Sequence, residues 1–506
     1  MDAADIVHNN GYFVFKGAAG GSSYIGLNGA SDATNGFYNV EIHASGRTVN
    51  ISSSNLTIHN NLYVTIGTLD TTTLDLTVTG AIDITGTLTG NASAISAGGL
   101  RVNDTGIFNA PTSAGSCSIT GELSSYAFRI SGGGTLNNNT GTITFLNVNS
   151  RLMMNGTGNI YNLTLNHASC FIMLHSDGTT TIEGNLTITA GQLTTYMEGT
   201  TTSKDLTVTG NTTGAGTLTL NDSTYTGGGH LSMTGTVTIG TSGVITGVDQ
   251  LGESGGTITC TGSPTLGFER WRQPTANWTP ATSTIKLEGH TRAFQTNGYG
   301  VPYNLEIDNS SNTNEMSSTV EVSNNLTITA GTLDTSSSDY ALTVTKQVRM
   351  NGGTLTLNGS TCEFGNVWYA ATSTINGNTS NIELNNGDVS GWIWYQTGGT
   401  FNYDTSTVEV KENGKYIRSN FYNLKIECPA EANRCIWRPL TGGATDTMTV
   451  HNDLTIVEGG FDSDGIANVM VVTNDVSVES GGHLGRYRSD SGSPETGART
   501  FGSLTI

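Results

Sequence analysis

The chain has 506 residues and a formal net charge of −20, from 21 Lys and Arg against 41 Asp and Glu, and only 12% of its residues are charged, about half the usual share. Gly accounts for 67 residues and Pro for 8, and the abundance of Thr, Ser, Asn and β-branched side chains favours strands separated by turns. Because the Gly has no three-residue period and the 35% apolar residues alternate regularly, a collagen fold and a disordered chain are both excluded.

The acidic balance also limits the partners. Basic residues are scattered rather than clustered, which predicts no nucleic-acid partner. No window approaches eighteen consecutive apolar residues, which predicts no membrane insertion, and residues 1–8 have neither the basic stretch nor the apolar run of a secretory signal. The six cysteines make no metal-ligand spacing; only Cys428 and Cys435 lie close together, and the sequence leaves open whether they form a disulfide.

The first repeated element is a hexapeptide with Tyr-Asn at its second and third positions. Full copies occur at 37–42, 160–165, 302–307 and 421–426, and a degenerate copy occurs at 501–506. Its recurrence indicates a modular chain.

A second motif, with an Asn or Asp followed by alternating apolar and hydroxyl residues and then Gly, follows each full copy. It occurs at 61–70, 185–193, 325–334 and 453–462, so that the Asn-to-Asn (or Asn-to-Asp) offsets are 22, 23, 21 and 30. The repeats predict four β-solenoid modules, at 1–140, 141–281, 282–404 and 405–506, the last including the start of a further incomplete module.

Short Leu-Thr-Val strands within each module recur at about 15 to 22 residues, which fits coils of three strands and three turns. Leu and Val face one side of each strand and Thr the other, and stacking coils would bury the apolar sides as one continuous column. We expect Asn61, Asn185 and Asn325 to stabilise stacked turns, because Asn tolerates left-handed conformations and bonds neighbouring backbone.

The predicted fold is therefore all-β, an elongated parallel β-helix (β-solenoid) of roughly 25 short stacked coils, at about 4.8 Å per coil. An array of Greek-key sandwiches is the alternative architecture, since it also gives short strands at regular spacing.

The tryptophans are the least repetitive feature, and all six lie between positions 271 and 437. The segment 268–281 interrupts the repeat and contains prolines, so we expect a protruding loop that exposes Trp271 and Trp278. Trp392 and Trp394 alternate along one strand, which would place both indoles on one face, either in the core or as an exposed row for sugar stacking. These four residues are the predicted glycan-binding residues.

No enzymatic machinery is recognisable. No nucleophile elbow, phosphate loop, zinc-binding His pair or dinucleotide fingerprint occurs in a sequence context that would support it. Acidic residues are too thinly spread to nominate a catalytic pair. The segment 462–465 begins like a calcium loop but lacks the downstream Glu. The sequence thus predicts no catalytic residue, no metal site and no cofactor.

The running Gly-Thr-Leu-Thr and Asn-Leu-Thr-Ile strings, which span nearly the whole chain, resemble the β-solenoid repeats of bacteriophage tail fibres and spikes and of bacterial surface adhesins. The favoured hypothesis is a non-enzymatic structural virion protein of a bacteriophage, a tail fibre, spike or capsid appendage that contributes to host-surface attachment. A bacterial or archaeal cell-surface adhesin or extracellular filament subunit is the alternative. A glycan-degrading β-helix enzyme is the second alternative.

Neither end of the sequence shows a capping segment, so we expect an end-to-end neighbour or a homo-oligomer. The resemblance to phage fibres implies a trimer, other virion proteins as partners and a host surface glycan as ligand. It implies location in the virion, or an extracellular or cell-surface location for the adhesin alternative.

Overall fold

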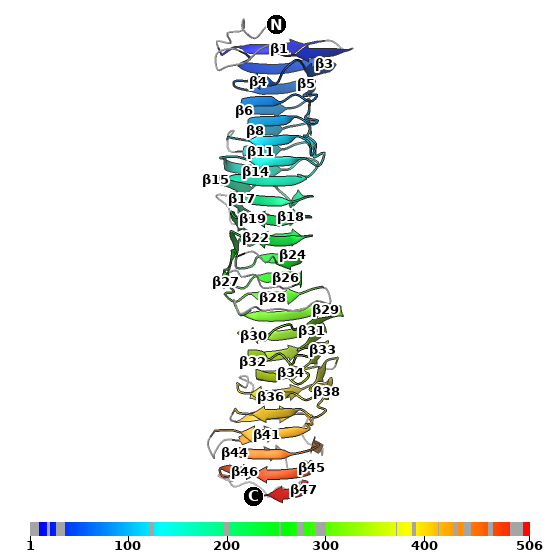
Figure 1. Ribbon diagram of the computed structural model, residues 1–506, viewed down its shortest axis with the longest axis vertical. Coiled ribbons are helices and arrows are strands. Elements are labelled where there is room, and N and C mark those ends of the chain that lie inside the picture. The colour runs from blue at the N-terminus through cyan, green and yellow to red at the C-terminus, as the bar shows by residue number, and fades with distance from the viewer. Residues whose placement is uncertain are drawn as a thin grey trace. The chain divides into compact units, whose positions relative to one another are not determined.

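The computed structural model describes residues 10–17, 21–26, 36–121, 126–196, 202–251, 255–270, 277–289, 300–370, 372–386, 391–412, 414–429, 434–438, 447–463, 469–485 and 499–505. These residues form 47 strands and no helix, and therefore no apolar helix long enough to cross a membrane (Figure 1). The strands pair in parallel as the stacked coils of a β-solenoid, which confirms the predicted fold class.

The chain contains about 19 turns rather than roughly 25. The predicted number was too high because many coils are longer than the regular repeat: hydrogen-bonded partners in neighbouring coils stand 26 residues apart at Arg129 and Asn103 and 30 apart at Asp453 and Asn423. The chain divides into two compact units, unit 1 (Met1–Pro264 and Pro274–Thr279) and unit 2 (Thr265–Gln273 and Pro280–Ile506). The four sequence modules remain a prediction.

The strands of unit 1 are β1 (Tyr12–Lys16), β2 (Ser22–Ile25), β3 (Asn39–Ile51), β4 (Leu56–Ile58), β5 (Leu62–Asp70), β6 (Leu76–Ile84), β7 (Thr87–Thr89), β8 (Ala94–Val102), β9 (Ile107–Asn109), β10 (Ser116–Ile119), β11 (Tyr126–Ile130), β12 (Thr135–Asn137), β13 (Thr142–Phe145), β14 (Asn149–Met154), β15 (Asn162–Leu174), β16 (Thr180–Ile182), β17 (Leu186–Thr194), β18 (Leu206–Val208), β19 (Thr212–Gly214), β20 (Thr217–Thr219), β21 (Thr224–Gly227), β22 (His230–Met233), β23 (Thr236–Ile239), β24 (Val244–Leu251), β25 (Thr257–Cys260) and β27 (Asn277–Thr279).

The strands of unit 2 are β26 (Thr265–Arg270), β28 (Thr284–Leu287), β29 (Asn304–Glu315), β30 (Val320–Val322), β31 (Leu326–Asp334), β32 (Leu342–Met350), β33 (Thr354–Thr356), β34 (Thr361–Tyr369), β35 (Thr374–Asn376), β36 (Asn381–Leu384), β37 (Trp392–Gln396), β38 (Thr400–Asn402), β39 (Thr407–Val410), β40 (Lys415–Arg418), β41 (Asn423–Glu427), β42 (Arg434–Trp437), β43 (Thr447–Val450), β44 (Leu454–Ser463), β45 (Val469–Val478), β46 (Gly482–Leu484) and β47 (Arg499–Thr505).

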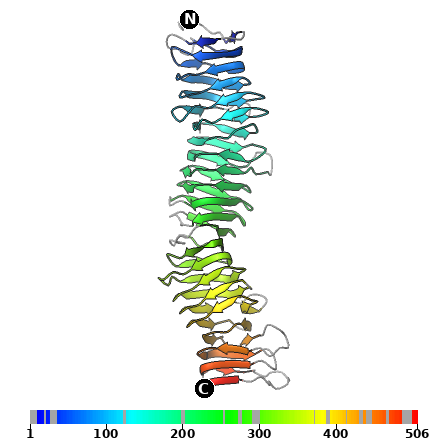
Figure 2. The same ribbon diagram turned by 90° about the vertical axis from the view of Figure 1, so that its right-hand side faces the viewer.

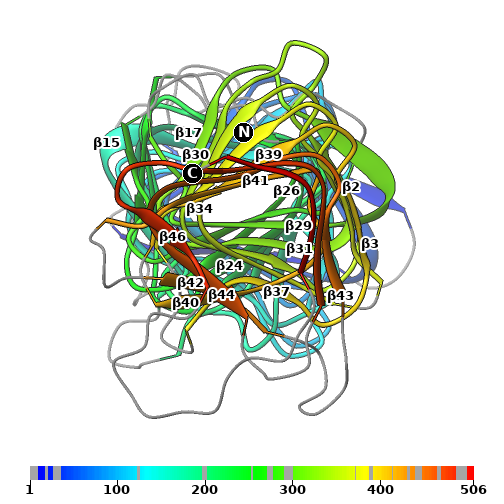
Figure 3. The ribbon, with the colours of Figure 1, turned by 90° about the horizontal axis from the view of Figure 1, so that it is seen from below.

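One coil of unit 1 illustrates the construction. The two halves of β6 and then β7 form three successive strand segments, after which β8 returns to lie beside β6, with Leu76 opposite Ile95 and Ile82 opposite Leu100. β7 lies between β5 and β9. Within each unit the strands run across the direction in which the coils stack (Figure 2), and Figure 3 shows the C-terminal coils of unit 2 end-on, with their strands around the core.

The core is a column of inward-facing apolar side chains that continue from coil to coil. In unit 1, Leu62, Ile82, Leu100, Phe128 and Leu152 occupy one register position in successive coils, and all five are completely buried. Full burial of each such side chain contributes about 1.5–3 kcal/mol. The alternation of apolar and hydroxyl residues in the sequence therefore determines which side of each strand faces the core.

The repeat Asn residues connect the backbones of neighbouring coils. Asn185 Oδ1 accepts a hydrogen bond from Asn211 N (2.8 Å), and Asn211 Oδ1 accepts one from His230 N (2.9 Å). In unit 2, Asn325 Oδ1 accepts from Gln347 N (3.3 Å). The predicted backbone bonding is confirmed, but the repeat Asn residues themselves do not adopt left-handed backbone conformations.

The left-handed positions lie elsewhere in the coil. The Gly of the second motif has a positive φ in all four copies: 89° at Gly67, 87° at Gly191, 81° at Gly331 and 77° at Gly459. An L residue other than Gly is disfavoured there, which explains why this Gly recurs. Other turns place Asn in the same region, as at Asn358 (φ 49°).

The segment 268–281 was predicted to be a protruding loop, and this is wrong for its described parts. β26 extends to Arg270 and pairs with β28 within unit 2, and β27 pairs with β25 within unit 1. Pro280 follows β27 and so removes no ladder hydrogen bond, which lets strands form beside the proline. Residues 271–276 lie outside the described part.

Candidate functional site

Three of the four predicted glycan-binding tryptophans lie in the described part of the chain, and their environments differ. Trp271 lies outside the described residues. Trp278 is half-buried on β27, where it lies in register with the buried Ile258. Trp394 is completely buried, whereas Trp392 on the same strand is half-buried.

A β-bulge separates the environments of Trp392 and Trp394. Against β40, Trp392 lies opposite Tyr416 and Trp394 lies opposite the very next residue, Ile417, so Ile393 is an extra residue on β37. A bulge breaks the two-residue alternation of a strand. The prediction that both indoles share one face is therefore wrong.

Trp394 is a core residue. Its ring centroid lies 4.8 Å from that of Phe401, 5.6 Å from that of Phe421 and 6.0 Å from that of Tyr369. Its Nε1 donates a hydrogen bond to Tyr369 Oη (3.3 Å), and burial raises the pKa of that phenol. A ligand outside the solenoid cannot stack on this indole.

Trp392, in contrast, belongs to a group of outward-facing aromatic and arginine side chains on unit 2, which we call the aromatic–arginine strip. It comprises Arg349, Trp368, Trp392, Tyr395, Tyr416, Arg418 and Arg438. They come from β32, β34, β37 and β40 and from the residue after β42; β37, β40 and β42 are labelled in Figure 3.

The strip follows the strand register. Arg349 lies opposite Trp368, Trp368 opposite Tyr395, and Tyr395 opposite Arg418. Arg438 N donates to the carbonyl of Ile417 (3.0 Å), which places Arg438 beside the end of β40. Consecutive coils therefore each contribute a side chain to one outward-facing column.

The cations of the strip lie over its rings. The guanidinium carbon of Arg349 is 4.8 Å from the Trp368 ring centroid, and that of Arg418 is 5.4 Å from the rings of both Trp392 and Tyr395. Such contacts contribute about 0.5–1 kcal/mol each at exposed sites and hold both partners in defined positions. The strip is therefore an ordered surface.

Of this strip, the sequence nominated only Trp392 as a binding residue. The others are spread over some ninety residues and become neighbours only through the register of four coils. The signal that could have found them is an aromatic or Arg at the outward position of each coil, flanked by buried residues such as Val367 and Tyr369 around Trp368.

Unit 1 has a smaller cluster of the same kind. Arg129 and Arg151 lie 5.7 and 5.9 Å from the Tyr126 ring, and His175 meets that ring edge-on at 5.3 Å. Burial, followed by the nearby cations Arg151 and Lys204, lowers the pKa of His175. This cluster contains one Tyr ring where the strip has four aromatic rings.

A charged ladder on β36, β39 and β41 is the other polar group of unit 2. Lys425 Nζ lies 2.7 Å from Glu409 and 2.8 Å from Glu427, and Lys411 Nζ lies 2.7 Å from Glu383. Burial, and then a hydrogen bond donated to Glu427, raise the pKa of Glu409, whereas hydrogen bonds from Glu409 and Lys425 lower that of Glu427 to about 2. Both carboxylates share Lys425 Nζ as their partner, which is the arrangement of an ion cluster that joins neighbouring strands.

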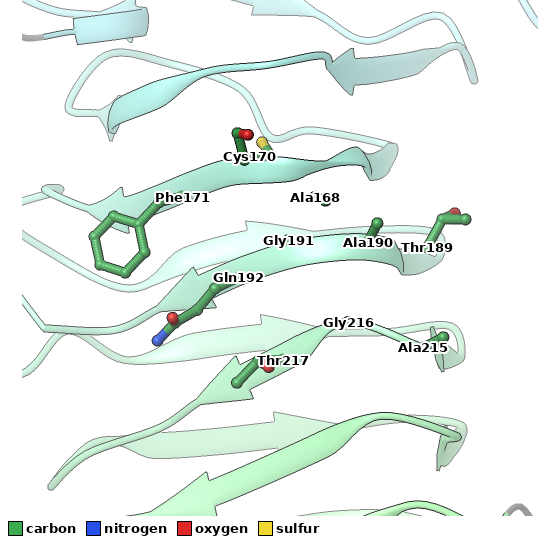
Figure 4. A pocket seen from close by; sticks show the side chains of 11 residues that line it. Ala168, Cys170, Phe171, Thr189, Ala190, Gly191, Gln192, Ala215, Gly216 and Thr217 are labelled. Carbon is green, nitrogen blue, oxygen red and sulfur yellow. The ribbon is translucent and has the colours of Figure 1, made fainter.

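A shallow hollow of about 410 Å³ lies on unit 1, lined by 168–171, 189–192 and 215–217 (Figure 4). It exists because small residues lie side by side on three coils; a Cβ on Gly191 would lie 2.4 Å from the carbonyl oxygen of Cys170. Its lining contains no charged side chain and no cluster of polar groups that converge on a ligand.

Among the described residues no three His, Cys, Asp or Glu side chains gather as they would around a metal ion. Cys428 and Cys435, whose bonding the sequence left open, are both buried free thiols. Comparisons with protein-family models, curated proteins and solved structures give no match.

Proposed function

We propose that this chain is a non-enzymatic structural protein that attaches a particle to a glycan-bearing surface, with the aromatic–arginine strip as the contact. The favoured setting is a bacteriophage virion, where the chain would be a tail fibre, spike or capsid appendage. The observation that carries the proposal is the strip itself: four aromatic rings and three arginines that face outward from consecutive coils.

Aromatic rings suit this role because they present broad apolar faces at a low cost in side-chain entropy. A solenoid suits it because backbone hydrogen bonds to both neighbouring coils fix the position of each ring. Trp368, for example, lies on β34 between β32 and β37. Binding residues on such a scaffold are preorganised for a rigid ligand.

The virion setting rests on the resemblance of the repeat strings to phage fibres and spikes. Genes for portal, capsid or tail proteins beside this gene would support it. A secretion signal or anchoring domain in a longer precursor would instead assign the same strip to a cell-surface adhesin.

The attachment function is tested with the double variant Trp368→Ala/Tyr395→Ala. Binding of the purified chain to bacterial cells and to an array of immobilised surface polysaccharides is measured, with Tyr24→Ala as the control, because Tyr24 is 69% exposed on unit 1. We expect the double variant to lose binding while its circular dichroism spectrum is unchanged, and the control to bind normally. Wild-type binding that persists in the double variant, or no binding to any glycan, contradicts the proposal.

A further inference from the structure

We propose that the ligand of the aromatic–arginine strip is an acidic polysaccharide that runs across the strands, from coil to coil. Its anionic groups, carboxylate or sulfate, would meet the arginines, and its sugar rings would meet the aromatic side chains. This inference rests on the proposed function and adds to it the chemical class and the direction of the ligand.

The direction follows from the register. Arg349, Trp368, Tyr395 and Arg418 occupy one position on four neighbouring strands. Strands lie about 4.8 Å apart, so this column is about 14 Å long and has a cation at each end with two rings between. A chain lying parallel to a single strand would meet only one or two of these side chains.

The acidic class follows from the arginines. A guanidinium has five N–H donors in its plane, and contact with the face of a ring uses none of them. Arg349 is exposed, and of its nitrogens Nε donates to Asn351 Oδ1 (3.1 Å); among the described residues it makes no ion pair. Its terminal nitrogens can therefore donate two parallel hydrogen bonds to a carboxylate or sulfate.

The net charge of −20 opposes an anionic ligand, so the position of the carboxylates relative to the column matters. Along the register column, no Asp or Glu stands between Arg349 and Arg418, and Glu306 lies two strands before Arg349, about 10 Å away by strand spacing. The Debye length at physiological ionic strength is about 8 Å, so carboxylates at that distance are screened whereas direct contacts to the arginines are not.

Single-stranded nucleic acid also combines stacking bases with anionic groups. It carries a charge on every nucleotide and so requires a continuous basic surface, whereas this strip has more rings than cations on a strongly acidic chain. The mixture of rings and spaced cations favours a polysaccharide in which uncharged ring faces alternate with acid groups.

The test uses polymer pairs that differ only in charge: polygalacturonate against its methyl ester, and dextran sulfate against dextran, with oligo(dT) as a separate probe. The proteins are the full wild-type chain, Arg349→Gln/Arg418→Gln/Arg438→Gln, the corresponding triple Lys variant, and Arg47→Gln as the control. Arg47 is a half-buried cation of unit 1 that donates to Ser23 Oγ (3.3 Å) and lies over no ring among the described residues. Arg349→Gln alone is included because an exposed site tolerates the change without loss of folding.

We expect the wild type to bind at least one acidic polymer roughly tenfold or more tightly than its neutral partner, since charge-assisted pairs contribute about twice as much as neutral ones. The triple Gln variant should lose this preference, the triple Lys variant should keep part of it, Arg349→Gln should weaken it, and Arg47→Gln should leave it unchanged.

Equal binding of acidic and neutral polymers that disappears in Trp368→Ala/Tyr395→Ala but not in the Arg variants would overturn this inference and leave the attachment function standing. Acidic preference that survives the triple Gln variant would also overturn it. Preference for oligo(dT), or absence of binding to every polysaccharide and every cell surface, would overturn both.

Discussion

The same outward-facing position of one solenoid wall carries different chemistry in the two units. In unit 1 this column includes Tyr63, two residues after the repeat Asn, and then Asp83, Arg101 and Arg129. Arg101 donates two hydrogen bonds to Asp83, at 2.6 and 2.7 Å, and Arg129 donates one to Asn103 at 2.6 Å. The cations of this column are bound by oxygen atoms of the chain itself.

In unit 2 the equivalent column includes Thr327 and then Arg349, Trp368, Tyr395 and Arg418. Here the neighbour of a cation, one coil away, is an aromatic ring. The comparison teaches that packing restricts the inward positions of a solenoid to apolar residues, while each outward position is free to vary and acquires its role from the residues one coil before and after it.

The largest expected effect on stability compares an inward-facing and an outward-facing indole of β37. Trp394→Ala should lower the free energy of unfolding by about 3–5 kcal/mol, because it removes a fully buried indole, whereas Trp392→Ala on the outer side should cost distinctly less. Urea unfolding followed by far-ultraviolet circular dichroism measures both. Equal losses would show that the bulge does not separate the two indoles.

The next prediction compares the two columns directly. Asp83→Asn should destabilise by about 1–2 kcal/mol, because Arg101 loses a two-bond carboxylate partner that is only 18% exposed. Arg349→Gln should cost only about 0.5–1 kcal/mol, the contribution of its contact with the Trp368 ring. Hydrogen exchange measures each effect locally: the amides of β6 and β8 report on Asp83→Asn, and those of β32 and β34 report on Arg349→Gln. A larger loss for Arg349→Gln would contradict the distinction between a column whose cations are held by a carboxylate and one whose cations lie over aromatic rings.

The hydrogen bonds from the backbone of one coil to the repeat Asn of the coil before it occur in both units, and the next prediction compares them. Asn185→Ala in unit 1 and Asn325→Ala in unit 2 each remove an acceptor for the backbone N–H of the next coil, Asn211 or Gln347. Each should cost about 1 kcal/mol. We expect similar losses of hydrogen-exchange protection at the two N–H groups. A loss confined to one unit would show that the repeat Asn residues are not equivalent in the two units.

The smallest effect concerns pH and the charged ladder of unit 2. The pKa of Glu427 is lowered from 4.5 to about 2, first by its hydrogen bond with Glu409 and then by that with Lys425. A lowered pKa means that the folded state favours the ionised form, so this stabilisation is present above pH 4.5 and is lost as the pH falls toward 2. The raised pKa of Glu409 acts in the opposite sense, since its stabilisation declines as the pH rises above the ordinary value of 4.5.

Melting temperatures of the wild type and Glu427→Gln between pH 7 and pH 2 measure this contribution. The two curves should converge as the solution becomes acidic, because Gln cannot be protonated in this range. The matched control is Glu321→Gln on β30, which removes an exposed carboxylate of the same unit outside the charged ladder. Curves for Glu427→Gln that remain parallel to the wild type would show that the ladder does not stabilise the fold.

The sequence by itself determined the all-β solenoid, the inward positions of Leu, Ile and Val, and the bonding role of the repeat Asn residues. These features follow from local patterns. Alternation with period two assigns the two faces of a strand, and a repeat near the length of one coil places equivalent residues of successive coils next to each other. The number of coils was not determined in this way, because insertions such as that between Asn423 and Asp453 lengthen a coil without changing its motif.

Only the tertiary structure decided the candidate site. One extra residue at Ile393 turned Trp392 outward and Trp394 inward, and a bulge leaves no trace in the alternation of a Trp-Ile-Trp string. The partners of Trp392 in the strip, Arg349, Trp368 and Arg418, come from other coils and meet only through the strand register. Register depends on the length of every intervening turn, and this is why the sequence pattern could predict the wall of the solenoid but not the composition of its outer surface.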